Sequence, residues 1–190
     1  AMSAICVFCG SSSGSDPVFC DASRSLGVSI AARRHRLVYG GCHVGLMGVV
    51  ADAALGAGGA VTGVMTEQLV SAEVAHLGLT ELEVVSTMHA RKARMAELSD
   101  GVIVLPGGFG TLDETFEMIT WNQLGLVAVP VVFLDVDGYF APLFDFIDAS
   151  VSTGFVSPAN AALARRASSV VDAVDQAVAA PDMYTPKWLG

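Results

Sequence analysis

Residues 102–117 read Val-Ile-Val-Leu-Pro-Gly-Gly-Phe-Gly-Thr-Leu-Asp-Glu-Thr-Phe-Glu, and this stretch decides the fold. Its first four residues form a short, β-branched apolar run that predicts a buried strand, and Pro106 ends that strand. A glycine-rich turn follows, and Thr111 is then predicted to be the N-cap of a helix that runs to about Gly125. A strand, a glycine turn and a helix N-terminus in this order form a ready binding site for an anion.

The start of this helix also carries three acidic residues, Asp113, Glu114 and Glu117. One interpretation is a capping box, in which the side chain of Glu114 turns back to the N–H of Thr111 and only closes the helix end. A loop that binds phosphate is a poor place for three acids, however, unless some of them face another part of the ligand. The alternative interpretation therefore puts phosphate on the glycines and carboxylates beside an adjoining sugar.

Six short apolar runs alternate with longer segments of helical character, which is the pattern of a parallel sheet with helices on both faces. The predicted strands are residues 4–9, 37–39, 60–65, 82–85, 102–105 and 131–134. The alanine-rich segment 159–180 is expected to form helices that cover a sheet edge, with Pro181 as their end. We predict an α/β protein with a doubly wound parallel sheet in a single domain, residues 1–190, in which Ala1 is a cloning remnant.

The amino-acid composition and net charge of the chain limit the kinds of protein that it can be. The chain of 190 residues is 53% hydrophobic and 15% charged, which favours one well-buried domain. Ten basic against 19 acidic residues give a net charge of −9 without a long basic run, which argues against nucleic-acid binding. We expect no membrane segment and a cytoplasmic protein with reduced thiols. Cys6 and Cys9 form a CxxC, but in a strand they point to opposite faces, which disfavours a structural zinc site.

Three predicted strands end in glycine-rich or small residues, and the carboxyl ends of parallel strands meet at the same edge of the sheet. These ends read Gly10-Ser11-Ser12-Ser13-Gly14, Gly40-Gly41 and Gly107-Gly108. One nucleotide-like ligand could touch all three. The segment 41–48 resembles a dinucleotide fingerprint only loosely, because its spacing is not G-x-G-x-x-G, and this disfavours an NAD-dependent oxidoreductase.

A second charged segment, residues 88–98, is predicted to be a helix on which Arg91 shares the apolar side of Met88, Met95 and Leu98. Arg91 could simply bury its stem and leave its head in water. It could instead reach the crevice and bind phosphate or ribose hydroxyls through its planar guanidinium.

Lys92 points about 100° away from Arg91 on such a helix, and we expect it to compensate phosphate or substrate charge. The chain has only two lysines, and Lys187 lies in a Pro-flanked tail, so Lys92 is the only candidate for the Schiff base of a pyridoxal-phosphate enzyme. We disfavour that enzyme class. The histidines form no metal-binding spacing, and we expect neither a metal nor another cofactor.

Together, Pro106-Gly107-Gly108-Phe109-Gly110-Thr111-Leu112-Asp113-Glu114 and Met88-His89-Ala90-Arg91-Lys92 closely resemble the two signature motifs of the Lonely Guy family, the cytokinin riboside 5′-monophosphate phosphoribohydrolases. The likeness continues in order through nearly the whole chain, at residues 10–12, 39–41, 45–48, 120–125, 137–140 and 154–155. The chain departs from the family pattern at Cys42, at Met65-Thr66 and at Asp113.

The resemblance implies a Rossmann-like homodimer that hydrolyses the N-glycosidic bond of N6-substituted adenosine 5′-monophosphates, with AMP itself a further candidate substrate. Arg91 and Glu114 match the catalytic pair of the family. The converging loops and the resemblance together give these candidate substrate-binding residues: Gly10, Ser11, Gly40, Gly41, Glu73, Met88, Arg91, Lys92, Gly107, Gly108, Phe109, Gly110, Thr111, Asp113, Glu114 and Thr120.

Cleavage of a ribosyl C1′–N bond builds positive charge on the sugar, so a carboxylate beside the ribose stabilises that charge or activates the attacking water. We assign this role to Glu114. Arg91 would align the sugar, and the amides of residues 107–111 would hold the 5′-phosphate. A nucleotide-binding or sensing module that uses the same crevice without chemistry is the alternative function.

Overall fold

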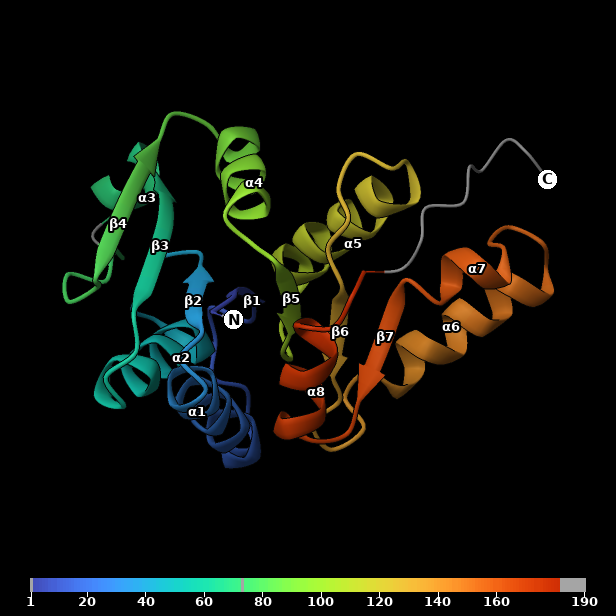
Figure 1. The fold of residues 1–190 in the computed structure, drawn as a ribbon, viewed down its shortest axis with the longest axis horizontal. Coiled ribbons are helices and arrows are strands. Elements are labelled where there is room, and N and C mark those ends of the chain that lie inside the picture. The colour runs from blue at the N-terminus through green and yellow to red at the C-terminus, as the bar shows by residue number, and fades with distance from the viewer. Residues whose placement is uncertain (1, 73, 182–190) are drawn as a thin grey trace.

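The computed structural model describes residues 2–72 and 74–181 of the chain. Seven strands in this part form one parallel sheet in the order β4-β3-β2-β1-β5-β6-β7 (Figure 1). The chain moves outward from β1 to β4 and then returns to the other side of β1 for β5, β6 and β7. This confirms the predicted doubly wound α/β fold.

The strands are β1 Ala4–Phe8, β2 Arg36–Tyr39, β3 Val61–Thr66, β4 Glu81–Val85, β5 Gly101–Val104, β6 Val131–Leu134 and β7 Ala164–Ala167. The helices are α1 Pro17–Ala32, α2 Gly45–Gly56, α3 Glu67–Ser71, α4 Met88–Glu97, α5 Phe109–Gln123, α6 Ala141–Ser152, α7 Pro158–Ala161 and α8 Val170–Ala177. No helix of the described ranges is long and apolar enough to cross a membrane.

Helices cover both faces of the sheet, which is why its central strands can be apolar on both sides. One core cluster joins the sheet to α1, α2 and α8, and the other joins it to α4, α5 and α6. Cys9 belongs to the first cluster and Cys6 to the second, so the two thiols of the CxxC lie on opposite faces, as predicted. All four cysteines are free.

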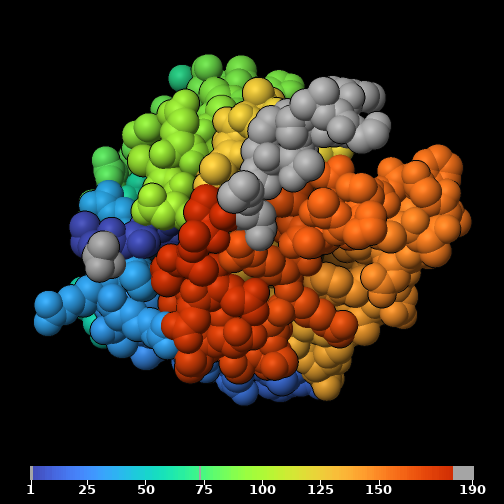
Figure 2. Space-filling model, turned by 45° about the vertical axis from the view of Figure 1, so that its right-hand side comes forward, coloured from blue at the N-terminus to red at the C-terminus, as the bar shows by residue number. Residues whose placement is uncertain are grey.

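The C-terminal segment is only partly helical, and the prediction of helices throughout 159–180 is wrong. β7, with the sequence Ala-Arg-Arg-Ala, pairs in parallel with β6 along its whole length. Alanine and arginine favour a helix locally, but the open edge of β6 provides backbone partners, and charged residues suit an edge strand. The segment from α6 to α8 forms one flank of the molecule (Figure 2).

Helix α5 begins three residues earlier than predicted. Its N-cap is Gly108, without a side-chain hydrogen bond, and Thr111 is buried within the first turn. The side chain of Thr111 packs back onto the glycine turn, because a Cβ at Gly107 would overlap Thr111 Oγ1. The prediction that Thr111 is the N-cap is therefore wrong, and the N-terminus of α5 has no side-chain cap. The first N–H groups of a helix have no partner within the helix, so here they are available to a ligand.

Candidate active site

A cleft of about 320 Å³ lies at the carboxyl ends of β1 and β5. These strands are neighbours in the sheet, and the winding direction changes between them, which is where open α/β sheets bind ligands. The lining residues are Gly10, Ser11, Ser12, Ser13, Gly14, Phe19, Leu46, Pro106, Gly107, Gly108 and Tyr139. Two of the three predicted loops therefore converge directly on one crevice.

The glycine turn brings two backbones into close contact. The N–H of Gly10 donates to the carbonyl of Pro106 at 3.0 Å, and a Cβ at Gly10 would lie 3.2 Å from the Cα of Gly107. Gly108 and Gly110 differ, because a Cβ at either position would meet nothing within 4 Å, and neither has a positive φ. Protein packing does not require glycine at 108 and 110, which leaves close approach of a ligand as the physical reason for it.

Arg91 lies on α4, with 6% of its side chain exposed. Its Nε donates to the Val64 carbonyl at 2.8 Å, and Nη2 donates to the Gly40 carbonyl at 3.1 Å. A Cβ at Gly40 would overlap Nη2, so only glycine permits this contact. The guanidinium is thus held between the residue that follows β2 and a carbonyl of β3, and the interpretation that the head group lies in water is wrong.

Glu114 lies on α5, with 15% of its side chain exposed, and its Oε1 accepts a hydrogen bond from Arg91 Nη1 at 3.1 Å. Its side chain contacts Arg91 instead of turning back to the Thr111 N–H, so the capping-box interpretation is wrong. Burial raises the pKa of Glu114, and the positive charge of Arg91 opposes this effect without cancelling it. The result is a carboxyl group whose pKa is shifted toward neutral pH, as in many general acids and bases.

Lys92 also links α4 to α5. Its Nζ lies 3.0 Å from Asp113 Oδ2 and 2.9 Å from Glu117 Oε2, and 11% of its side chain is exposed. Burial lowers the pKa of Lys92, but the hydrogen bonds to Glu117 and Asp113 outweigh it, so the pKa is raised. A Schiff-base lysine must lose its proton easily, so this environment does not fit that role.

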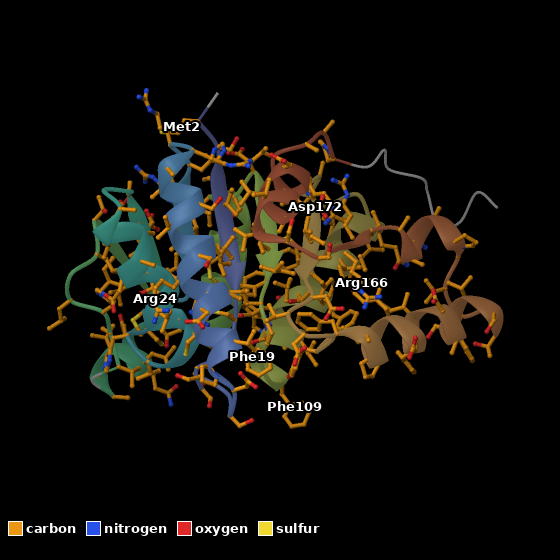
Figure 3. The ribbon with its side chains drawn as sticks, turned by 90° about the horizontal axis from the view of Figure 1, so that it is seen from below. Met2, Phe19, Arg24, Phe109, Arg166 and Asp172 are labelled. Carbon is orange, nitrogen blue, oxygen red and sulfur yellow. The ribbon has the colours of Figure 1, made fainter. Side chains whose placement is uncertain are left out.

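The other predicted site residues lie in different places. Gly41 adopts a positive φ of 79°, and its carbonyl accepts from the His76 N–H at 2.9 Å. Met88 is half exposed at the start of α4, and Phe109 is 94% exposed at the start of α5, where its side chain points away from the protein (Figure 3). Thr120 donates to the Phe116 carbonyl at 2.7 Å and lines a groove beside α6, away from the cleft.

Glu73, the remaining predicted site residue, lies outside the described residues. Seven residues that line the cleft were not among the predicted site residues: Ser12, Ser13, Gly14, Phe19, Leu46, Pro106 and Tyr139. Tyr139 follows the strand next to β5, so its position at the carboxyl edge of the sheet was the available signal. Across residues 2–72 and 74–181, no group of three or more His, Cys, Asp or Glu side chains is placed to hold a metal.

The fold and the site define a class: a Rossmann-like α/β protein with an anion-binding glycine turn at the switch point and a buried Arg–Glu pair beside it. Comparison with known proteins places the chain within this class. Residues 47–177 match the protein family described as "Possible lysine decarboxylase". The chain belongs to this family, and its phosphoribohydrolase members confirm the Lonely Guy resemblance.

Two relatives illustrate the similarity. The chain is 49% identical over 154 residues to a cytokinin riboside 5′-monophosphate phosphoribohydrolase of Arabidopsis thaliana, and the aligned residues cover 81% of this chain and 71% of the relative. It is 48% identical over 156 residues to an enzyme of the same name from Rhodococcoides fascians, and the aligned residues cover 82% of this chain and 79% of the relative. Among solved structures, the molybdenum cofactor carrier protein of Chlamydomonas reinhardtii superposes with a TM-score of 0.69 at 21% identity, over 92% of this chain and 95% of that one. This last similarity concerns the fold alone.

Proposed function

We propose that this protein hydrolyses the N-glycosidic bond of N6-substituted adenosine 5′-monophosphates to give the free base and ribose 5-phosphate. AMP itself is a further candidate substrate. The observation that carries the proposal is the buried contact of 3.1 Å between Arg91 and Glu114, which joins α4 to α5 beside the glycine turn. The names of the relatives at 48–49% identity support the same reaction.

The 5′-phosphate binds, in this proposal, at the N-terminus of α5. The uncapped N–H groups and the positive end of the helix dipole attract an anion there, and the space beside Gly108 and Gly110 admits it. The net charge of −9 repels anions at long range, so binding must depend on such local donors.

Glu114 acts on the ribose. One carboxylate oxygen is held by Arg91, and the other is left to stabilise positive charge on the sugar or to take a proton from the attacking water. Arg91 uses three of its five N–H groups on Val64, Gly40 and Glu114, so it is rigid and aligns the carboxylate. The scheme uses neither a metal nor a redox cofactor.

We also propose a cytoplasmic homodimer. The four free cysteines are compatible with a reducing compartment. A second copy of the chain would cover the groove between α5 and α6, which is lined in part by Phe116, Ile119 and Phe146, with Phe146 largely exposed. Light scattering should report twice the monomer mass of 19.6 kDa, and Phe146→Asp should shift the protein toward the monomer. A monomeric wild-type protein would contradict this assembly.

The function is tested by incubating the full chain with N6-isopentenyl-AMP and with AMP, and by measuring free base and ribose 5-phosphate chromatographically. We expect the two products in equal amounts. Tight nucleotide binding without either product would favour the non-catalytic binding module instead. Carbon dioxide release from lysine in the presence of pyridoxal phosphate would support the decarboxylase that the family description suggests.

A further inference from the structure

Tyr139 reaches the glycine turn from the loop after β6. Asp137 and Gly138 both adopt positive φ angles, 52° and 71°, and this turn presents Tyr139 toward the cleft. The tyrosine ring packs edge-on against Phe19, with ring centroids 5.9 Å apart, and against Phe140, with centroids 5.0 Å apart. Two aromatic contacts therefore fix the direction of a side chain that is itself partly exposed.

The hydroxyl of Tyr139 donates a hydrogen bond to the carbonyl oxygen of Gly107. That carbonyl and the N–H of Gly108 belong to one planar trans peptide, so they point in opposite directions. A hydrogen bond that holds the Gly107 carbonyl toward Tyr139 also sets the direction of the Gly108 N–H. Gly108 is the N-cap of α5, where the structure offers no side-chain cap.

A peptide between two glycines needs such a restraint. Glycine populates both signs of φ with similar ease, so the 107–108 peptide can rotate at a lower cost than any other in the turn. Neither neighbour has a side chain that could restrict it, and a Cβ at Gly108 would contact nothing within 4 Å. The Tyr139 hydroxyl is the side-chain group that holds this peptide among the described residues.

The hydroxyl of Tyr139 has a single proton, so it can either hold the Gly107 carbonyl or bind an anion directly, but not both. A tyrosine hydroxyl has one O–H to donate, and here it is given to Gly107. The Tyr139 oxygen then offers only lone pairs to the cleft, and lone pairs repel a phosphate. Direct binding of an anion by Tyr139 would require the hydrogen bond to Gly107 to break.

We propose that Tyr139 is a positioning residue, which holds the Gly107–Gly108 peptide so that the Gly108 N–H faces the 5′-phosphate of the nucleotide. The inference rests on the phosphate site of the proposed function. It requires nucleotide binding at this turn but not hydrolysis, so the two can fail separately.

The test is Tyr139→Phe, which removes the hydroxyl and keeps the ring that packs on Phe19. Calorimetry with AMP and with adenosine should show AMP binding weakened about 2- to 12-fold, the effect of one hydrogen bond, and adenosine binding unchanged. The matched control is Tyr39→Phe, which removes a hydroxyl that donates to the Cys42 carbonyl at 3.1 Å, and it should leave the ratio of AMP to adenosine affinity unchanged.

The amide proton of Gly108, followed by nuclear magnetic resonance with saturating AMP, separates positioning from direct binding. We expect a downfield shift on AMP addition in the wild type and a smaller one in Tyr139→Phe. An equal shift in both proteins would overturn the positioning role, as would unchanged AMP affinity or an equal loss for AMP and adenosine. If the wild type binds AMP without hydrolysing its substrates, the proposed function fails while this test remains readable.

Discussion

Substitution of Glu114 by glutamine removes the charge of the proposed catalytic group and preserves its shape. A full positive charge about 4 Å from a carboxylate is stabilised by about 4 kcal/mol at an effective dielectric constant near 20. The sugar carries only part of that charge in the transition state, and the amide oxygen retains some of the attraction. We therefore expect a barrier increase of at least about 2.7 kcal/mol, which is a loss of about 10²-fold in turnover.

The same substitution should leave the fold nearly intact. The glutamine oxygen can still accept from Arg91 Nη1, so a hydrogen bond between two charged groups becomes one between a cation and a neutral amide, at a cost of about 1 kcal/mol. Removal of a buried carboxylate, whose pKa is raised by burial, offsets part of this cost. We expect the melting temperature to fall by no more than about 2–4 °C.

The assay is chromatographic release of the free base from N6-isopentenyl-AMP between pH 4.5 and 8. Because burial raises the pKa of Glu114, the wild-type activity should fall on the acid side at a higher pH than an ordinary glutamate would cause, as the carboxylate takes up a proton. Glu114→Gln should lose this acid limb. Glu97→Gln, which neutralises an exposed acid on α4, is the matched control and should behave as the wild type. A folded Glu114→Gln protein with near-normal turnover would refute the assignment.

The remaining predictions concern the surroundings of this pair. Arg91→Ala should weaken both nucleotide binding and turnover and lower the free energy of unfolding by about 3–5 kcal/mol, measured by urea titration, because it leaves Glu114 buried without its partner; unchanged binding and turnover would contradict this. Lys92→Met should move the acid limb of kcat/KM to higher pH. The positive charge of Lys92 lowers the pKa of Glu114, whereas the negative charge of Asp113 raises it, so removal of Lys92 leaves the pKa higher. An unmoved or lowered limb would disprove the electrostatic link. Gly40→Ala should displace the Arg91 guanidinium and lower turnover, whereas Gly108→Ala should keep the melting temperature and weaken AMP binding measured by calorimetry; equal behaviour of the two would contradict the assigned roles.

The acid limb depends on every charged or titratable group near Glu114. Arg91 and Lys92 on α4 favour the carboxylate, and Asp113 on α5 disfavours it. The buried thiols of Cys6, Cys9 and Cys42 also interact with this carboxylate, but burial raises their pKa values further above the assay range, so they stay uncharged throughout it. The shift in Lys92→Met is therefore expected to come from the carboxylates and cations alone.

Strands with apolar side chains on both faces were predictable from the sequence, and all six predicted runs are strands. β7 was not, because Ala-Arg-Arg-Ala has no apolar pattern and becomes a strand only through the open edge of β6. The start of α5 was misplaced for a similar reason. Thr111 is a good N-cap by type, but contact with Gly107 in the folded chain turns its side chain inward.

Candidate site residues were predictable where a motif carried them, and their contacts were not. The sequence places Arg91 on an apolar helix face but contains no local sign that the carbonyls of Val64 and Gly40 would receive its guanidinium. The sharing of Lys92 by Asp113 and Glu117 also depends on how α4 packs beside α5. Such contacts join residues that are more than 20 positions apart, beyond the reach of helical or strand periodicity.

A crystal structure of Glu114→Gln with N6-isopentenyl-AMP tests the central claim most directly, because the variant should bind this nucleotide without cleaving it. We predict the 5′-phosphate on the N–H groups at the start of α5, and the ribose C1′ within about 4 Å of the residue 114 side chain, with Arg91 unmoved. A nucleotide whose ribose lies away from residue 114, or whose phosphate lies outside the glycine turn, would contradict the account.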